Sequence, residues 1–171
     1  HIRKDHGSID ILVNHAGISK NGISWKYELE DWQHVMNVNL TAPFLCIKHV
    51  LPLMREKNFG RIINISSVVA ETGFPGTVSY ASSKAGLAGL TKTVAREVAG
   101  KNITVNAIAP GYFNTGMIDN VPDDIRQEIL NSIPAKRFGR PEELTALIGY
   151  LASEEAGYLT GQVLNLNGGI I

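Results

Sequence analysis

The chain has 171 residues, of which 44% are hydrophobic, and its 16 Lys and Arg residues balance its 16 Asp and Glu residues. With no net charge there is no overall field to attract a nucleic acid or an anionic membrane surface, which argues against a charge-driven polymer binder. The length predicts a single domain over residues 1–171 with one buried core.

The cysteine content and the hydropathy pattern predict a protein of a reducing compartment. Cys46 is the only cysteine and can form no internal disulfide. No apolar run approaches the roughly 18 residues that a membrane span requires. We therefore expect a cytoplasmic protein. The chain begins at His1 rather than at a methionine, and the loss of an upstream targeting segment would leave an organellar location open.

The first half of the chain predicts one strand and one long helix. Residues 9–13 form a short apolar run that predicts a buried strand. Residues 31–57 predict an amphipathic helix, with acidic residues near its positive N-terminal end. Its apolar positions are Leu40, Phe44, Ile47, Leu51 and Met54. We expect Pro43 and Pro52 to interrupt this helix, and Pro43, which lacks an N–H, to free the carbonyl of Asn39.

The second half predicts three more strands, alternating with helices. The expected strands are residues 61–65, 103–108 and 163–166, and the expected helices are residues 80–98, ended by Gly100, and a segment that begins at Pro141. Strands separated by helices cannot be joined as hairpins. The order therefore predicts an α/β fold: a doubly wound, Rossmann-like parallel sheet with helices on both faces.

Several short motifs follow one another along nearly the whole chain. They are Asn14-His15-Ala16-Gly17, Asn39, Ser66-Ser67, Tyr80-Ala-Ser-Ser-Lys84, Pro110-Gly111 with Thr115, and Asn167-Gly168-Gly169. Tyr and Lys four residues apart are by themselves an ordinary pairing on a helix surface. In this order and context, however, the set resembles the short-chain dehydrogenase/reductase family. Within it, the resemblance is strongest to the 3-oxoacyl-acyl-carrier-protein reductases.

The residue types of the Tyr80 motif suit proton transfer to a carbonyl oxygen. The Lys84 ammonium and the helix N-terminus both favour the phenolate, so we expect them to lower the pKa of Tyr80 and to make it a general acid/base. Ser67 would hydrogen-bond the same substrate oxygen, with Ser66 as the less favoured neighbour. Because parallel strands end at one crevice, Ala16, Ser67 and Pro110 should converge there.

The family resemblance implies further roles. It makes Asn39, Ser67, Tyr80 and Lys84 the catalytic residues, with Lys84 also contacting the nicotinamide ribose and Asn39 holding a water that links Lys84 to solvent. It implies that Pro110 to Thr115 bracket the nicotinamide and that residues 112–133 cover the substrate. The implied cofactor-binding residues are Asn14, His15, Ala16, Gly17, Tyr80, Lys84, Pro110, Gly111, Phe113 and Thr115. His15 stands where the family usually has asparagine.

The glycine-rich turn with which this family grips the pyrophosphate has no counterpart in the sequence. The spacing of the other motifs implies that about 70 upstream residues are missing, with the first strands of the sheet, so the chain would be the C-terminal two-thirds of a reductase. The strand at residues 9–13 would then be an exposed apolar edge. We accordingly expect residues 1–171 alone to be unstable.

Two other ligand hypotheses receive little support. The five histidines, His1, His6, His15, His34 and His49, have no ligand spacing, and we expect no metal site. Gly17 and Gly22 have the spacing that opens a P-loop, but Ile23 stands where lysine is required.

The resemblance thus implies an NADPH-dependent reduction of a 3-oxoacyl thioester, linked to acyl carrier protein or CoA, to the 3-hydroxyacyl form in fatty acid biosynthesis. NADP(H) is favoured over NAD(H), and the resemblance implies a homotetramer. Ala81, Ala85 and Gly89 are either plain core or part of its helical interface. Two alternatives remain open: an acetoacetyl-CoA reductase or another short-chain alcohol or sugar dehydrogenase, and a non-catalytic fragment that cannot hold cofactor.

Overall fold

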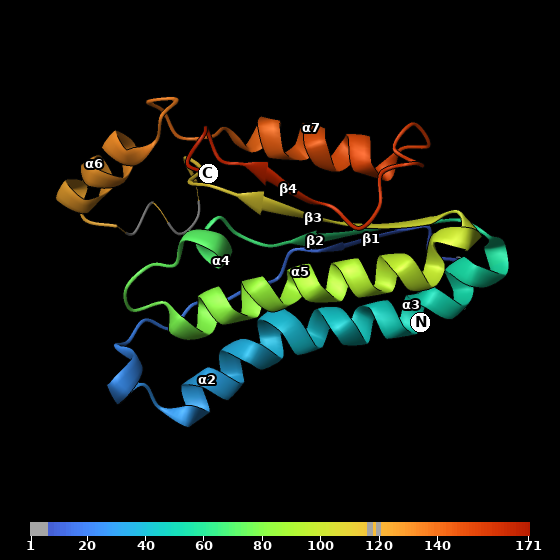
Figure 1. Ribbon diagram of the computed structural model, residues 1–171, viewed down its shortest axis with the longest axis horizontal. Helices are drawn as coiled ribbons and strands as arrows, with labels where there is room; N and C mark the ends of the chain where they lie inside the picture. Colours follow the sequence, from blue (N-terminus) through green and yellow to red (C-terminus); the bar gives the residue numbers. More distant parts are fainter. Residues whose placement is uncertain (1–6, 116–117, 119–120) are drawn as a thin grey trace.

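The computed structural model describes residues 7–115, 118 and 121–171. These residues form an α/β fold around a four-stranded parallel sheet of order β1-β2-β3-β4 (Figure 1). The strands are β1 (Ile11–Asn14), β2 (Gly60–Ile65), β3 (Ile103–Pro110) and β4 (Val163–Leu166). The predicted fold class and the predicted strands are confirmed, with ends shifted by one or two residues.

Helices cover both faces of the sheet. One face is covered by α3 (Ala42–Lys57) and α5 (Val78–Val98), and the other by α7 (Pro141–Ala152) (Figure 1). The chain also forms shorter helical elements: η1 (Ser24–Lys26), α2 (Leu29–Met36), η2 (Asn37–Thr41), α4 (Val69–Thr72), η3 (Ala99–Lys101) and α6 (Asp123–Ser132). Among the described helices, none combines the length and apolar character that a membrane crossing needs.

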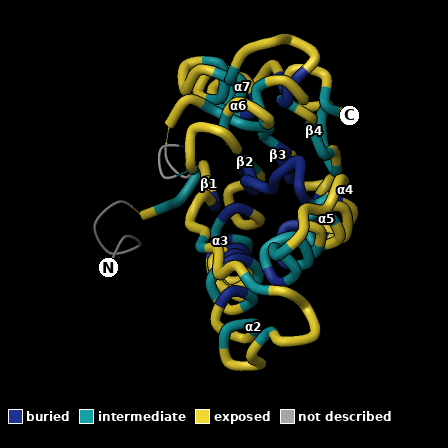
Figure 2. The backbone as a smooth tube through the Cα atoms, turned by 90° about the vertical axis from the view of Figure 1, so that its left-hand side faces the viewer, coloured by how far each residue is buried: buried dark blue, intermediate teal, exposed yellow. Residues whose placement is uncertain are grey.

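The core has two apolar layers, because side chains along a buried strand alternate between the faces of the sheet. Ile62 packs with Met54 of α3 and Val94 of α5, whereas Ile63 and Ile65 pack with Leu151 of α7. The most buried backbone accordingly runs through β2 and β3 (Figure 2). This packing fixes the central strands, whose C-terminal ends carry the predicted site.

The long helix predicted over residues 31–57 begins at Leu29 and contains a π-helical turn that the sequence pattern did not predict. In that turn, η2, the Ala42 N–H donates to the carbonyl of Asn37, five residues earlier. Pro43 follows in the first turn of α3, where a missing N–H is tolerated. Pro52 lies inside α3, so the expected interruption at this proline is wrong.

Helix α5 begins two residues before the predicted start and ends at the predicted residue, but Gly100 does not stop it as expected. It ends at Val98, and Gly100 continues the chain in the 3-10 turn η3 instead of ending the helix. The left-handed residue that reverses the chain toward β3 is Asn102, with φ 51°. Asparagine tolerates this conformation better than most residues, which explains why a glycine is not needed there. The sequence also did not predict α4 and α6.

Strand β1 pairs only with β2 and forms an edge of the sheet. Its residues Ile11 and Val13 are exposed. The apolar edge expected from the sequence is therefore present in the described residues, while the instability expected from it stays a prediction.

Candidate active site

The loop after β2 brings the Ser66-Ser67 motif against the end of β3. The Ser66 N–H donates to the carbonyl of Ile108 at 2.7 Å, and the Val68 N–H donates to the carbonyl of Pro110 at 2.8 Å. Backbone pairing thus continues past the last residue of β2. As expected for parallel strands, Ser67 and the Pro110-Gly111 turn lie side by side at the C-terminal end of the sheet.

Lys84 reaches this end of the sheet from α5 and is 97% buried, since only 3% of its surface is exposed. Its Nζ donates to the carbonyl of Ile65 at 2.7 Å and lies 5.7 Å from the centre of the Tyr80 ring. Burial lowers the pKa of Lys84 from its ordinary 10.5 to about 8. The ammonium therefore keeps its charge at neutral pH but releases its proton more readily than an exposed lysine.

The pKa of Tyr80 is shifted in the direction opposite to the one predicted. Burial raises this pKa above its ordinary value of 10.0, and the hydroxyl of Ser67 opposes the shift. The expectation that Lys84 and the helix N-terminus would lower the pKa is wrong here, because the loss of solvation around the phenol raises the pKa more than the Ser67 hydroxyl lowers it. Tyr80 is accordingly a neutral phenol at neutral pH, which is the form that can donate a proton.

The two serines of the motif have different partners. The Ser66 hydroxyl donates to the carbonyl of Lys84 at 2.9 Å and so ties α5 to the end of β2. The Ser67 hydroxyl accepts a hydrogen bond of 3.3 Å from the Val69 N–H and also lies beside Tyr80. Of the two, Ser67 is the one hydrogen-bonded to the phenol, and the preference for Ser67 as the catalytic serine stays a prediction.

Asn39 lies in η2 and is fully buried. Its side-chain oxygen accepts from the N–H of Ile18, its Nδ2 donates to the carbonyl of Ile18, and both distances are 2.9 Å. A third bond of 3.1 Å reaches Ser83 of α5. Asn39 therefore clamps the loop after β1 to the helix that carries Tyr80. Its predicted role in holding a water stays a prediction.

Asn14 carries out a structural task that the sequence analysis missed. Its Nδ2 donates to the side chain of Asn64 at 2.8 Å, and Asn64 donates to the hydroxyl of Thr91 at 2.9 Å. This buried polar ladder crosses from β1 through β2 to α5. The signal was available, since β1 ends in Asn14, the next-to-last residue of β2 is Asn64, and the two residues pair in the parallel register. His15, Ala16 and Gly17 follow on the surface.

The turn after β3 packs against the C-terminal segment. A Cβ on Gly111 would lie 2.8 Å from the Cα of Asn167, so only glycine fits this close approach. Phe113 forms a backbone bridge with Gly139, and Thr115 is exposed. Of the predicted covering segment 112–133, residues 116–117 and 119–120 lie outside the described residues, and Asp123–Ser132 form α6 beyond the strand ends (Figure 1).

Asn167 was given no chemical role from the sequence, yet it organises this corner. Its side-chain oxygen accepts from the N–H groups of Gly169 and Ile170 at 3.0 and 3.2 Å. Its Nδ2 is buried without a hydrogen-bond partner within the described residues. Asn167 thereby joins the turn at Gly111 to the end of the chain.

The site has features that fit the ribose and nicotinamide end of a dinucleotide. An ammonium has three protons to donate, and the Lys84 ammonium uses one of them on Ile65. A Cβ on Gly17 would lie 3.3 Å from the Lys84 Nζ, so the absence of a side chain at Gly17 lets the loop after β1 approach the ammonium closely. Within the described residues, no group of three His, Cys, Asp or Glu side chains is placed to hold a metal ion.

Comparison with known proteins places this site in a family. The sequence model of the family described as enoyl-(acyl carrier protein) reductase matches residues 1–171. The chain is 47% identical over 166 residues to a 3-oxoacyl-acyl-carrier-protein reductase FabG of Thermotoga maritima, covering 97% of this chain and 68% of that protein. It is 44% identical over 169 residues to the protein of the same name from Haemophilus influenzae, covering 99% of this chain and 70% of that protein.

A relative with a different name matches equally well. Nodulation protein G of Azospirillum brasilense is 48% identical over 169 residues, covering 99% of this chain and 69% of that protein. The parallel sheet, the site at its C-terminal end and these matches define one class: the chain belongs to the short-chain dehydrogenase/reductase family. It is of the NAD(P)-dependent short-chain oxidoreductase type, and its cofactor is a nicotinamide dinucleotide.

Proposed function

We propose that this protein reduces a 3-oxoacyl thioester to the 3-hydroxyacyl form, with NADPH as the reductant, in fatty acid biosynthesis. The observation that carries the proposal is a neutral, half-buried Tyr80 beside the Ser67 hydroxyl, with the Lys84 ammonium one helical turn away. A ketone oxygen needs one proton as its carbon is reduced, and this arrangement places the protonated hydroxyl of Tyr80 beside the hydroxyl of Ser67. The names of the FabG relatives support the 3-oxoacyl substrate.

In the proposed mechanism, the Tyr80 and Ser67 hydroxyls hydrogen-bond the ketone oxygen of the substrate. When bound at this site, a reduced nicotinamide would supply the hydride for the ketone carbon. Tyr80 then gives its proton to the developing alkoxide, and Ser67 stabilises the charge on that oxygen while it forms. The Lys84 ammonium lies close enough to stabilise the resulting phenolate, which regains a proton from solvent, with Asn39 proposed to hold the connecting water.

Cofactor binding is proposed to use the residues around Lys84. The Lys84 ammonium would contact the ribose hydroxyls, and the main chain of Asn14 to Gly17 would line the same side, because the Asn14 amide is engaged with Asn64. Pro110, Gly111, Phe113 and Thr115 would bracket the nicotinamide. We propose NADP(H) rather than NAD(H), acyl carrier protein as the carrier of the substrate, a cytoplasmic location, and a single domain over residues 1–171.

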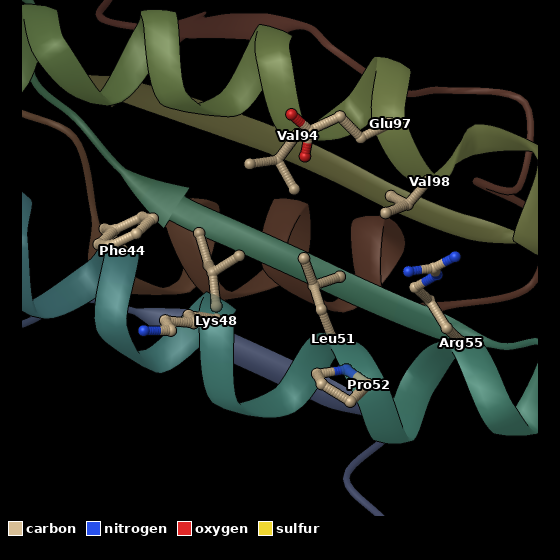
Figure 3. Close-up of a pocket in the computed structure, with 9 residues that line it drawn as sticks. Phe44, Lys48, Leu51, Pro52, Arg55, Val94, Glu97 and Val98 are labelled. Atoms are coloured by element: carbon tan, nitrogen blue, oxygen red, sulfur yellow. The ribbon is translucent and has the colours of Figure 1, made fainter.

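We also propose that the protein is a homotetramer whose subunits meet through α3 and α5. A groove lies between these helices, and in it Leu51 of α3 and Val94 and Val98 of α5 point toward one another (Figure 3). The large side chains of Phe44 and Leu45 on α3 are exposed. Ala85 and Gly89 are exposed on α5, so they are not plain core and leave a smooth surface for a neighbouring helix.

The substrate class is tested by steady-state NADPH oxidation in the full chain. Acetoacetyl-CoA and 3-oxoacyl-acyl-carrier-protein represent the proposed substrates, and crotonyl-CoA, a simple ketone and a sugar represent other substrates of such reductases. We expect kcat/KM to be highest for the acyl-carrier-protein thioester and lower with NADH. Preference for the CoA ester would favour an acetoacetyl-CoA reductase, and preference for the sugar would favour a sugar dehydrogenase. Absence of NADPH binding would favour a non-catalytic chain.

A further inference from the structure

The loop between β1 and α2 carries a tyrosine that has no place in the mechanism above. Tyr27 follows η1, and its hydroxyl is hydrogen-bonded to the Ser79 hydroxyl at 2.7 Å. The same hydroxyl donates to the carbonyl of Lys20 at 2.8 Å. Ser79 is fully buried in the first turn of α5 and immediately precedes Tyr80. Tyr27 thus touches the backbone neighbour of the proposed proton donor.

The Tyr27 ring also has a defined packing site. A Cβ on Gly22 would lie 2.8 Å from the ring, so Gly22 provides the space that the ring fills. The Gly22 N–H donates to the carbonyl of Gly76 at 2.9 Å, and Gly22 forms a backbone bridge with Thr77, the residue before α5. The loop after β1 and the start of α5 are therefore joined by backbone and by side chain.

Successive residues of an α-helix point about 100° apart. Ser79 can therefore be anchored on one side of α5 while Tyr80 points from the next side toward Ser67. Thr77, the N-cap residue of α5, forms no side-chain cap with the helix. The first turn of α5 consequently lacks its own side-chain cap and depends on neighbours for its position, and Tyr27 supplies one of them.

We propose that Tyr27 is a positioning residue for Tyr80. Its hydroxyl fixes Ser79, and thereby the first turn of α5, so that the Tyr80 phenol meets the substrate oxygen together with Ser67. This inference rests on the proposed function of Tyr80. An error of about 1 Å in such a contact can cost as much as 100-fold in rate, so a hydrogen bond one residue away has a kinetic consequence.

The test is a double-mutant cycle of Tyr27→Phe and Ser79→Ala in the full chain. Tyr27→Phe keeps the ring on Gly22 and removes only the hydroxyl. We expect each single change to lower kcat for acetoacetyl-CoA reduction about 10-fold, with KM and the NADPH dissociation constant within about twofold, and the double variant to lose no more than either single. Tyr158→Phe, on a fully exposed tyrosine, is the matched control and should leave kcat unchanged.

A kcat for Tyr27→Phe equal to that of the control, or strictly multiplicative losses in the cycle, would overturn the proposal. A parent protein that reduces no 3-oxoacyl thioester would instead refute the proposed function. In that case amide hydrogen exchange tests the positioning role of Tyr27 without turnover. Faster exchange over residues 78–82 in Tyr27→Phe and in Ser79→Ala, with the rest of α5 unchanged, supports that role. Unchanged exchange in that turn rejects it.

Discussion

The two halves of α5 are held in place by different interactions, mainly apolar packing in the C-terminal half and hydrogen bonds in the N-terminal half. The C-terminal half buries Val94 and Val98, which pack against the sheet, and its one buried polar side chain, Thr91, accepts a hydrogen bond from Asn64. The N-terminal half buries Ser79, Ser83 and Lys84, which are polar and are held by hydrogen bonds to Tyr27, Asn39 and Ile65. Apolar burial in the C-terminal half stabilises the fold. Burying polar side chains in the N-terminal half costs folding free energy but holds the site residues in place.

The largest effect is expected at the polar end. Tyr80→Phe removes the proposed proton donor but keeps the ring, so kcat for acetoacetyl-CoA reduction should fall about 1,000-fold while NADPH affinity stays nearly unchanged. Stopped-flow turnover and NADPH fluorescence titration measure the two quantities, with Tyr158→Phe as the matched control. Turnover retained in Tyr80→Phe would remove this residue from its role.

A smaller effect of a different kind is expected in the apolar half. Val94→Ala deletes two buried methyl groups and should lower the free energy of unfolding by about 2 kcal/mol. It should leave kcat unchanged at a temperature where the variant is folded. Urea denaturation followed by circular dichroism gives the stability. A loss of kcat without a loss of stability would mean that the two halves are not separable in this way.

A third effect is a dependence of stability on pH. The pKa of Lys84 is about 8 in the folded chain and 10.5 ordinarily. Between about pH 8 and 10 the unfolded chain therefore keeps a proton that the folded chain has lost, and the folded state becomes more stable as the pH rises. Lys84→Met should remove this gain, which urea midpoints at pH 8 and 10 would reveal. Identical pH dependence in both proteins would argue against a lysine whose charge is suppressed by burial.

The same substitution has a functional consequence at neutral pH. Lys84→Met should weaken NADPH binding and turnover together, because it removes both the proposed ribose contact and the charge near Tyr80. NADPH fluorescence titration of the parent and the variant measures the first quantity. An unaffected NADPH affinity would reject the ribose contact.

The difference between the two halves also explains what the sequence could predict. The apolar periodicity that includes Val94 and Val98 predicted the C-terminal half of the helix, and parallel strands predicted the meeting of Ser67 with Pro110. The resemblance to a family supplied Tyr80 and Lys84. None of these patterns predicts which buried polar groups hydrogen-bond to each other. The ladder of Asn14, Asn64 and Thr91, for example, joins residues that are far apart in the chain and meet only in the folded protein.

Two errors have physical causes that a sequence pattern does not carry. The direction of the Tyr80 pKa shift depends on how completely the phenol is buried, and no motif encodes that degree of burial. The π turn at Asn37–Thr41 replaces a regular helix because of local hydrogen bonding, which places Asn39 against Ile18 and Ser83. The pKa shift and the π turn both occur at the candidate active site, where proteins commonly depart from sequence-based structural rules because function requires it.

The most direct test of the account is the pKa of Tyr80 itself. The protein, labelled with carbon-13 at the tyrosine Cζ, is titrated by nuclear magnetic resonance, and the Tyr80 signal is assigned as the one missing from Tyr80→Phe. The account predicts a pKa above the ordinary 10.0, so that Tyr80 is a neutral proton donor at neutral pH. A pKa well below that value would contradict it and would restore the phenolate that the sequence alone suggested.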